Sequence, residues 1–378
     1  MFDGVRGVAT VLVVISHGWT LWPTDEINAH QGLRQLFASG DAAVSVFFVI
    51  GAFLTTSGLL GLADSHRLRP LVAVTRRWVR LSAQTYLLLA VVLVVLIVEP
   101  SSTYPDTDTG ASVLHVATYT WNWFLHSHPV QARPDLGHLW YLSVDFQVFL
   151  MTLVLVYAFR GRRLALVVTL GGLLLLCLWW RAHMYDVDPL GVTLRTWTRA
   201  DSPLVGALAA AALPWLRRLT PWAWLLSVGG VVLLVPSFWF AADVSAYFGW
   251  AGFAVDLAAA AVVVGCSLAE PPRLLSRSLG SAPLTFVGRQ SLGIYLWHYP
   301  VFWFLARHTF DWSWPSKTLL AAGIIGVAVY LGHRFSDVPA QRLLAQDWWR
   351  SMEGGRRRAT TPTVTSGDAA GRSESAER

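Results

Sequence analysis

The sequence predicts an all-α, polytopic integral membrane protein with about ten transmembrane helices. Hydrophobic residues make up 54% of its 378 residues and charged residues only 14%, far from the composition of a soluble globular protein. Apolar runs long enough to cross a hydrocarbon core of about 30 Å recur along most of the chain. Many of the 20 tryptophans lie near the ends of these runs, as Trp22, Trp222 and Trp312 do, which is typical of an interfacial aromatic belt.

The apolar segments are predicted to span the bilayer one after another. In chain order they are Val5–Trp22, Ala42–Ala63, Leu81–Val98, Leu139–Phe159, Leu164–Trp180, Ser202–Leu216, Trp222–Ala241, Phe248–Ala269, Phe286–Ala306 and Thr318–Phe335. The sixth is short and its ends are indistinct, so the count of about ten leaves nine or eleven spans open.

Arginine residues indicate the orientation, because basic residues are favoured in cytoplasmic loops. With the N-terminus inside, that side receives Arg6, the cluster from Arg67 to Arg80 and the run from Arg160 to Arg163, and the opposite side receives fewer. Both termini are therefore predicted to be cytoplasmic. Residues 1–349 are predicted to form one transmembrane domain. Residues 350–378, which are rich in Gly, Ser, Thr and charge, are predicted to form a disordered cytoplasmic tail.

The first span, Phe2–Trp22, carries a polar stripe. Asp3, Arg6, Thr10 and His17 fall within an arc of roughly 60° at 100° per residue, so this stripe faces protein or water. Arg6 and His17 lie roughly 16 Å apart along the helix axis, too far for direct contact. One reading is a signal-anchor in which Arg6 sets orientation and His17 makes a buried hydrogen bond. The other is a functional site, because ionisable groups are costly inside a membrane.

The fourth span places His138, Tyr141 and Asp145 on one helical face, and Trp140, Ser143 and Gln147 on the opposite one. A helix that is polar on both sides is surrounded by protein. Asp145 is the only carboxylate in this span, and a buried carboxylate needs a cationic or hydrogen-bonding partner. The sequence offers His17 or an arginine as the partner of Asp145.

The ninth span reads VGRQSLGIYLWHYPVF. Its Ser291, Tyr295 and His298 share one face, and Pro300 is expected to kink the helix and free a carbonyl group. The alternative is structural, with Tyr295 and Trp297 as packing aromatics and His298 as an interfacial anchor.

A group of arginines opens the third span in the segment TRRWVRLSAQTY. Arg77 and Arg80 lie three residues apart, and Arg76 and Arg80 four apart, so they share nearly one helical face. Anchoring at the inner surface explains them without any chemistry. The alternative is that their forked guanidinium groups bind phosphate at the mouth of a membrane site.

Charge and cysteine content narrow the expected partners. The formal net charge of +6 is explained mainly by topology, and no nucleic-acid partner is expected. Cys177 and Cys266 each lie in an apolar run and are expected to be buried thiols. The sequence indicates no metal site, no disulfide and no permanently bound cofactor.

Together, in chain order from Asp3 to Gln341, these segments resemble the membrane acyltransferase-3 family, polytopic enzymes that O-acylate sugars, peptidoglycan and antibiotics. The opening DGVRGVATVLVVISH is similar to the family's DGLRG segment, including the spacing of Arg6 and His17. VSVFFVIGAFLTT resembles FFVISGFLIT, RRWVRL resembles RxxR, HLWYLSVDFQVFL resembles WSLSVEEQFYL, and SLGIYLWHYPVF resembles SIYLWHWPVF. FSDVPAQ matches the family's terminal acidic-x-proline segment.

The chain also departs from the family pattern. Gly51 and Ala52 stand where the family has Ser and Gly, so no hydroxyl can act there. Asp145 replaces a glutamate and Phe146 a second acidic residue, which leaves one shorter carboxylate. Asp337 likewise replaces a glutamate. The family's optional extracytoplasmic hydrolase-like domain is not expected, so residues 1–349 resemble a stand-alone acyltransferase domain.

The resemblance implies transfer of an acyl group, with acetyl expected, from acetyl-CoA or another acyl-CoA to a hydroxyl of a carbohydrate, cell-envelope glycan or macrolide-like metabolite. His17 would be the general base, Asp145 would orient it, and Arg6 would stabilise negative charge or hold the donor phosphates. Arg76, Arg77 and Arg80 would bind the CoA phosphates. The expected substrate pocket consists of Trp140, Ser143, Tyr295, Trp297 and His298.

The expected location is the inner (plasma) membrane of a bacterial cell, as a multi-pass protein. A transporter or flippase for a glycan or lipid-linked sugar is the alternative, since polar sites inside the membrane suit it equally well. In that case His17 would have no role in chemistry. A structural membrane protein, which would tolerate the loss of His17, is a third hypothesis.

Overall fold

The structure, a computed structural model, describes residues 1–99 and 106–346. Within these ranges the chain folds into helices joined by short turns, and no strand occurs there. The predicted all-α class is therefore confirmed. The tail predicted for residues 350–378 lies outside the described residues.

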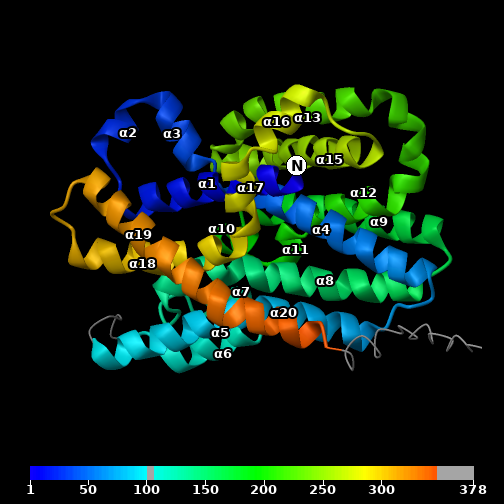
Figure 1. The fold of residues 1–378 in the computed structure, drawn as a ribbon. Coiled ribbons are helices and arrows are strands. Elements are labelled where there is room, and N and C mark those ends of the chain that lie inside the picture. The colour runs from blue at the N-terminus through cyan, green and yellow to red at the C-terminus, as the bar shows by residue number, and fades with distance from the viewer. Residues whose placement is uncertain (100–105, 347–378) are drawn as a thin grey trace, which may run out of the picture.

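Long helices form the body of the fold (Figure 1), and each predicted span overlaps one of them. They are α1 (Phe2–Leu21), α4 (Gly40–Asp64), α5 (Pro70–Val98), α8 (Trp140–Ala158), α9 (Arg163–Met184), α12 (Asp201–Leu216), α13 (Ala223–Ala241), α15 (Gly252–Leu268), α18 (Ser291–His308) and α19 (Trp314–Gly332). The connecting elements are α2 (Asp25–Ala29), α3 (Gln31–Ala38), α6 (Thr109–Ala117), α7 (Trp121–Ser127), η2 (Pro134–Leu139), α10 (Pro189–Leu194), α11 (Thr196–Arg199), η3 (Arg217–Trp222), α14 (Val244–Ala246), η4 (Tyr247–Ala251), α16 (Arg273–Leu279), α17 (Ala282–Arg289), η5 (His333–Asp337) and α20 (Val338–Leu344).

Eight stretches of the described chain are long and apolar enough to cross a membrane. One of them, Asp201–Ala241, is 41 residues long and contains α12 and α13, separated by the 3₁₀ turn η3. The helix α18 is not among the eight. The chain is therefore a multi-pass membrane protein, whereas the count of ten spans and the cytoplasmic location of both termini stay predictions.

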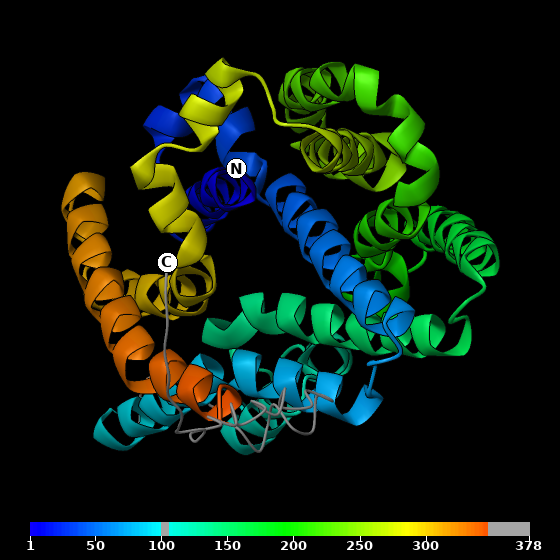
Figure 2. The same cartoon turned by 45° about the vertical axis from the view of Figure 1, so that its right-hand side comes forward.

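The helix α4 runs through the middle of the bundle (Figure 2), with α9, α12, α13 and α15 on one side and α1, α17 and α18 on the other. Ion pairs join α9 to α12 within the first group, and the neighbouring α11 to α4. Arg181 of α9 pairs with Asp201 of α12, and both side chains are buried. Arg199 lies 3.3 Å from Asp41 of α4, which ties this group to the central helix.

The backbones of α1 and α17 approach each other closely. A methyl group on Gly7 would overlap the carbonyl oxygen of Leu284, and one on Gly288 would overlap that of Asp3. Only glycine fits at these crossings, because any Cβ would push the two helices apart. The contact places Arg6 beside Ser291, the first residue of α18, with a 2.7 Å hydrogen bond from the guanidinium to the hydroxyl.

We expect Gly7→Ala to destabilise the protein by about 1–3 kcal/mol, because the new methyl meets backbone rather than a movable side chain. The measurement is the thermal unfolding midpoint of the purified protein in detergent. Gly172→Ala in α9 is the matched control, since nothing lies within 4 Å of that position. Equal midpoints for the two variants would contradict this account of the α1–α17 crossing.

Candidate active site

His17 of α1 and His298 of α18 face each other in the interior of the bundle. Nδ1 of His17 lies 2.7 Å from Nε2 of His298, and the two rings are nearly parallel with centroids 5.1 Å apart. His298 is fully buried. The structure thus joins two residues that sequence analysis had selected separately, one in each of two distant spans.

Hydrogen bonding determines which nitrogen of the pair is free to act as a base. Nδ1 of His298 lies 3.0 Å from the carbonyl oxygen of Ile294, which can only accept, so this nitrogen carries a proton. Nε2 of neutral His298 is then an acceptor, and Nδ1 of His17 donates to it. This assignment leaves the lone pair of His17 on Nε2, where it can take a proton from a substrate.

Two more rings surround the pair, and sequence analysis gave neither a role. His138 of η2 is 3% exposed, its ring centroid lies 5.4 Å from that of His298, and neither of its ring nitrogens makes a hydrogen bond. The ring centroid of Tyr299 lies 4.8 Å from that of His17, and these two rings meet edge to face. Its centroid also lies 4.8 Å from that of His138. The sequence signal for His138 was its place on one face with Tyr141 and Asp145; Tyr299 gave no separate signal.

Asp145 was predicted to orient His17, but the two residues do not contact each other. Its carboxylate pairs with Arg77 of α5 at 2.5 Å, and the same guanidinium donates to the hydroxyl of Thr55 at 3.0 Å. The arginine, rather than the histidine, is therefore the partner of this carboxylate. The residue that orients His17 is His298, because it occupies the hydrogen-bonding position beside Nδ1.

A cavity of about 650 Å³ opens beside this ion pair, between α4, α5 and α8. Its polar wall contains guanidinium groups, and its remaining wall is largely apolar. The arginines that line it are Arg6, Arg67, Arg69, Arg76, Arg77 and Arg80. Guanidinium groups bind phosphate through paired hydrogen bonds, so this wall suits a polyanionic ligand.

Tyr295 separates the arginine-lined cavity from the histidines. It lines the cavity, its hydroxyl donates to the backbone carbonyl of His138, and its ring centroid is 5.8 Å from that of His298. Tyr295 therefore belongs to both the cavity wall and the histidine cluster, whereas neither His17 nor His298 lines the cavity.

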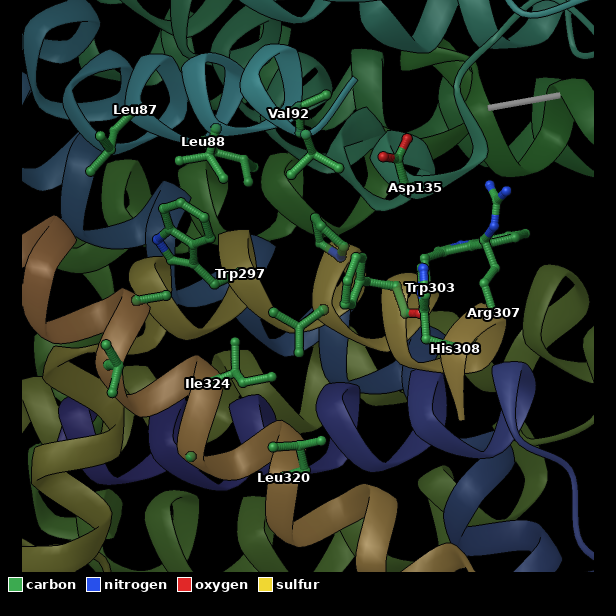
Figure 3. A pocket seen from close by; sticks show the side chains of 18 of the residues that line it. Leu87, Leu88, Val92, Asp135, Trp297, Trp303, Arg307, His308, Leu320 and Ile324 are labelled. Atoms are coloured by element: carbon green, nitrogen blue, oxygen red, sulfur yellow. The ribbon is translucent and has the colours of Figure 1, made fainter. Parts of the chain in front are cut away.

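The remaining predicted pocket residues lie elsewhere. The hydroxyl of Ser143 accepts the backbone N–H of Trp121 and so fixes the start of α7. The ring of Trp140 lies 4.8 Å from the guanidinium of Arg199. Trp297 lines a different cavity, between α5, α18 and α19 (Figure 3). Of the five residues predicted to form one pocket, only Tyr295 and His298 lie at the histidine cluster.

Within the described ranges, no group of three or more His, Cys, Asp or Glu side chains could hold a metal ion.

The chain belongs to a family of membrane acyltransferases, since the family model described as "Acyltransferase domain" matches residues 2–333. Among its relatives are the peptidoglycan O-acetyltransferase OatA of Listeria monocytogenes, 26% identical over 366 residues, and the O-acetyltransferase OatA of Staphylococcus aureus, 24% identical over 362 residues. These matches cover 90% of this chain but only 55% and 57% of the two relatives. The chain thus spans little more than half the length of these relatives. No solved structure matches the chain.

We expect a coupling free energy of about 1–3 kcal/mol between Arg77→Gln and Asp145→Asn, because each single variant leaves its partly buried partner without a counter-charge. The measurement is a double-mutant cycle on the unfolding free energy in detergent. Strictly additive effects would show that the two side chains do not interact.

Proposed function

We propose that this chain is an O-acyltransferase that moves an acyl group, expected to be acetyl, from acyl-CoA to a hydroxyl of a cell-envelope glycan. The observation that carries this proposal is the His17–His298 pair, whose hydrogen bonds leave a basic nitrogen on His17, with Tyr295 between the pair and an arginine-lined cavity. Family membership supports acyl transfer over the transporter alternative. The glycan acceptor is inferred from a relative that is named a peptidoglycan O-acetyltransferase.

In the proposed reaction, Nε2 of His17 accepts the proton of the acceptor hydroxyl while its oxygen attacks the thioester carbonyl carbon. The tetrahedral intermediate then collapses by cleavage of the carbon–sulfur bond. The imidazolium returns its proton to the departing thiolate, which gives an ester and free CoA. His298 supports the charged intermediate because its Nε2 accepts the Nδ1 proton of His17.

The arginine-lined cavity would bind the phosphates of the donor. Arg6 lines it near Ser291, about three helical turns from His17, so donor binding suits Arg6 better than direct contact with the reacting carbonyl. Asp145 would hold the guanidinium of Arg77 in place rather than act on the histidine. Because CoA thioesters are cytoplasmic, this cavity would open to the cytoplasm from a bacterial inner membrane, with both chain termini on the same side.

Replacement of His17 by Ala is expected to lower the rate of acyl transfer about 10²- to 10⁴-fold, the usual contribution of a general base. The assay offers radiolabelled acetyl-CoA and peptidoglycan fragments to the purified protein in nanodiscs, and it counts label in an alkali-labile ester. His183→Ala, at the end of α9, is the matched histidine control. Full activity of the His17 variant would contradict this mechanism.

The Arg80→Gln variant is expected to raise KM for acyl-CoA roughly tenfold and leave kcat nearly unchanged, because it removes a charged hydrogen-bond donor to the phosphates. Initial rates over a range of acetyl-CoA concentrations test this. Arg160→Gln, whose guanidinium stacks on Tyr157 outside the cavity, controls for loss of charge. A fall in kcat with unchanged KM would place Arg80 in the chemical step instead.

A further inference from the structure

A buried carboxyl group in α15 takes no part in the proposed reaction. Asp256 lies in the group of helices on one side of α4 (Figure 2), and it lines neither of the two cavities described above. Its side chain is 0% exposed, and neither carboxyl oxygen has a hydrogen-bond partner. An ionised carboxylate in that state is very costly, because nothing replaces the hydration that it has lost.

The cations near Asp256 are bound to other carboxylates. Two buried guanidinium groups, those of Arg181 and Arg199, act electrostatically on Asp256. Arg181 is ion-paired with Asp201, however, and Arg199 lies 3.3 Å from Asp41, which is 45% exposed. A negative Asp256 would draw one of these guanidinium groups into bonding distance, since charged hydrogen bonds are the strong ones. Its isolation from both therefore indicates a neutral carboxyl group.

The other elements around α15 supply no further charge at this point. The remaining titratable neighbours of Asp256 are uncharged at neutral pH: Tyr247 of η4 and Cys177 of α9. The helix α13, which packs along α15, contains no titratable residue. The two exposed arginines of η3 lie near the other end of α15, because the residue that follows η3 lies against Gly265.

A chain of hydroxyl groups leads from Asp256 to α4, and its hydrogen bonds run in one direction. The backbone carbonyl of Asp41 can only accept, so the hydroxyl of Tyr247 donates to it at 3.4 Å. Ser45 then donates to Tyr247 at 2.7 Å, and Ser202 donates to Ser45 at 3.2 Å. The proton of Ser202 is thus used, so its oxygen can only accept from the neighbouring Asp256. A carboxyl group can donate only when it is protonated.

We propose that Asp256 binds a proton in the folded protein at neutral pH and forms a proton-binding site where α4, α12 and α15 meet. The proton completes the hydroxyl chain and leaves each guanidinium group to its own aspartate. Release of the proton would place a negative charge near Arg181, whose Nε has no partner, and Asp256 would then compete with Asp201 for it. The packing of α15 against α9 and α12 would therefore depend on pH. The proposal does not depend on acyl transfer.

The test compares the wild type with Asp256→Asn by reversible denaturation in mixed micelles. In the unfolded chain this carboxyl group is exposed and ionised at neutral pH, so folding of the wild type takes up one proton. The asparagine variant has nearly the same shape and needs no proton. The ratio of the wild-type unfolding constant to that of the variant is therefore expected to rise with pH, by up to about tenfold per pH unit.

Two further variants calibrate this comparison. Asp186→Asn, which changes an exposed aspartate, is the matched control and should follow the wild type at every pH. Asp201→Asn should destabilise the protein at every pH, because it leaves the buried Arg181 without its partner. If the stability difference between Asp256→Asn and the wild type did not change with pH, Asp256 would be ionised in the fold and the proposal would be overturned.

Infrared spectroscopy keeps the proposal testable if Asp256→Asn does not fold. At neutral pH the wild type is expected to show the carbonyl stretching band of an un-ionised aspartic acid, and isotope-labelled aspartate should shift that band. The absence of such a band would overturn the proposal. Both measurements are made without substrate, so a failure of the proposed acyl transfer would not affect either result.

Discussion

The contact between His17 and His298 joins residues 281 positions apart, and the rest of the candidate site depends on it. It requires α1 and α18 to lie at a fixed separation. The glycine crossings of α1 with α17 set that separation, because α17 leads directly into α18. The glycines at the start of the chain thus contribute to a site several helical turns away, without contacting it.

The helix α18 contacts both cavities and carries one residue of the histidine pair. It begins at Ser291, which binds Arg6 at the arginine-lined cavity, and it carries His298 near its middle. It ends at Arg307 and His308, which line the second cavity, between α5, α18 and α19. At 1.5 Å per residue its 18 residues cover about 27 Å, so the two cavities are reached from opposite ends of one helix.

Much of the fold could be predicted from the sequence, because long apolar runs are sufficient to locate helices such as α1, α4 and α5. The polar stripe also identified Arg6 and His17 as residues that face protein or water rather than lipid. The partner of His17, and which arginine pairs with Asp145, could not be predicted, because local periodicity holds no information about which distant helix supplies a contact. Trp297 lines a different cavity from Tyr295, which agrees with the helical period, since two residues of helix place it roughly 200° from Tyr295.

The histidine pair contains no carboxylate, and this matters at its depth in the bundle. A histidine oriented by an aspartate requires a permanent negative charge, which is costly in surroundings of low polarity unless a cation balances it. Two neutral imidazoles carry no net charge in the resting state between turnovers. The histidine pair would then be charged only while a proton is being transferred. The permanent charges of the chain are carried by its arginines and their aspartate partners.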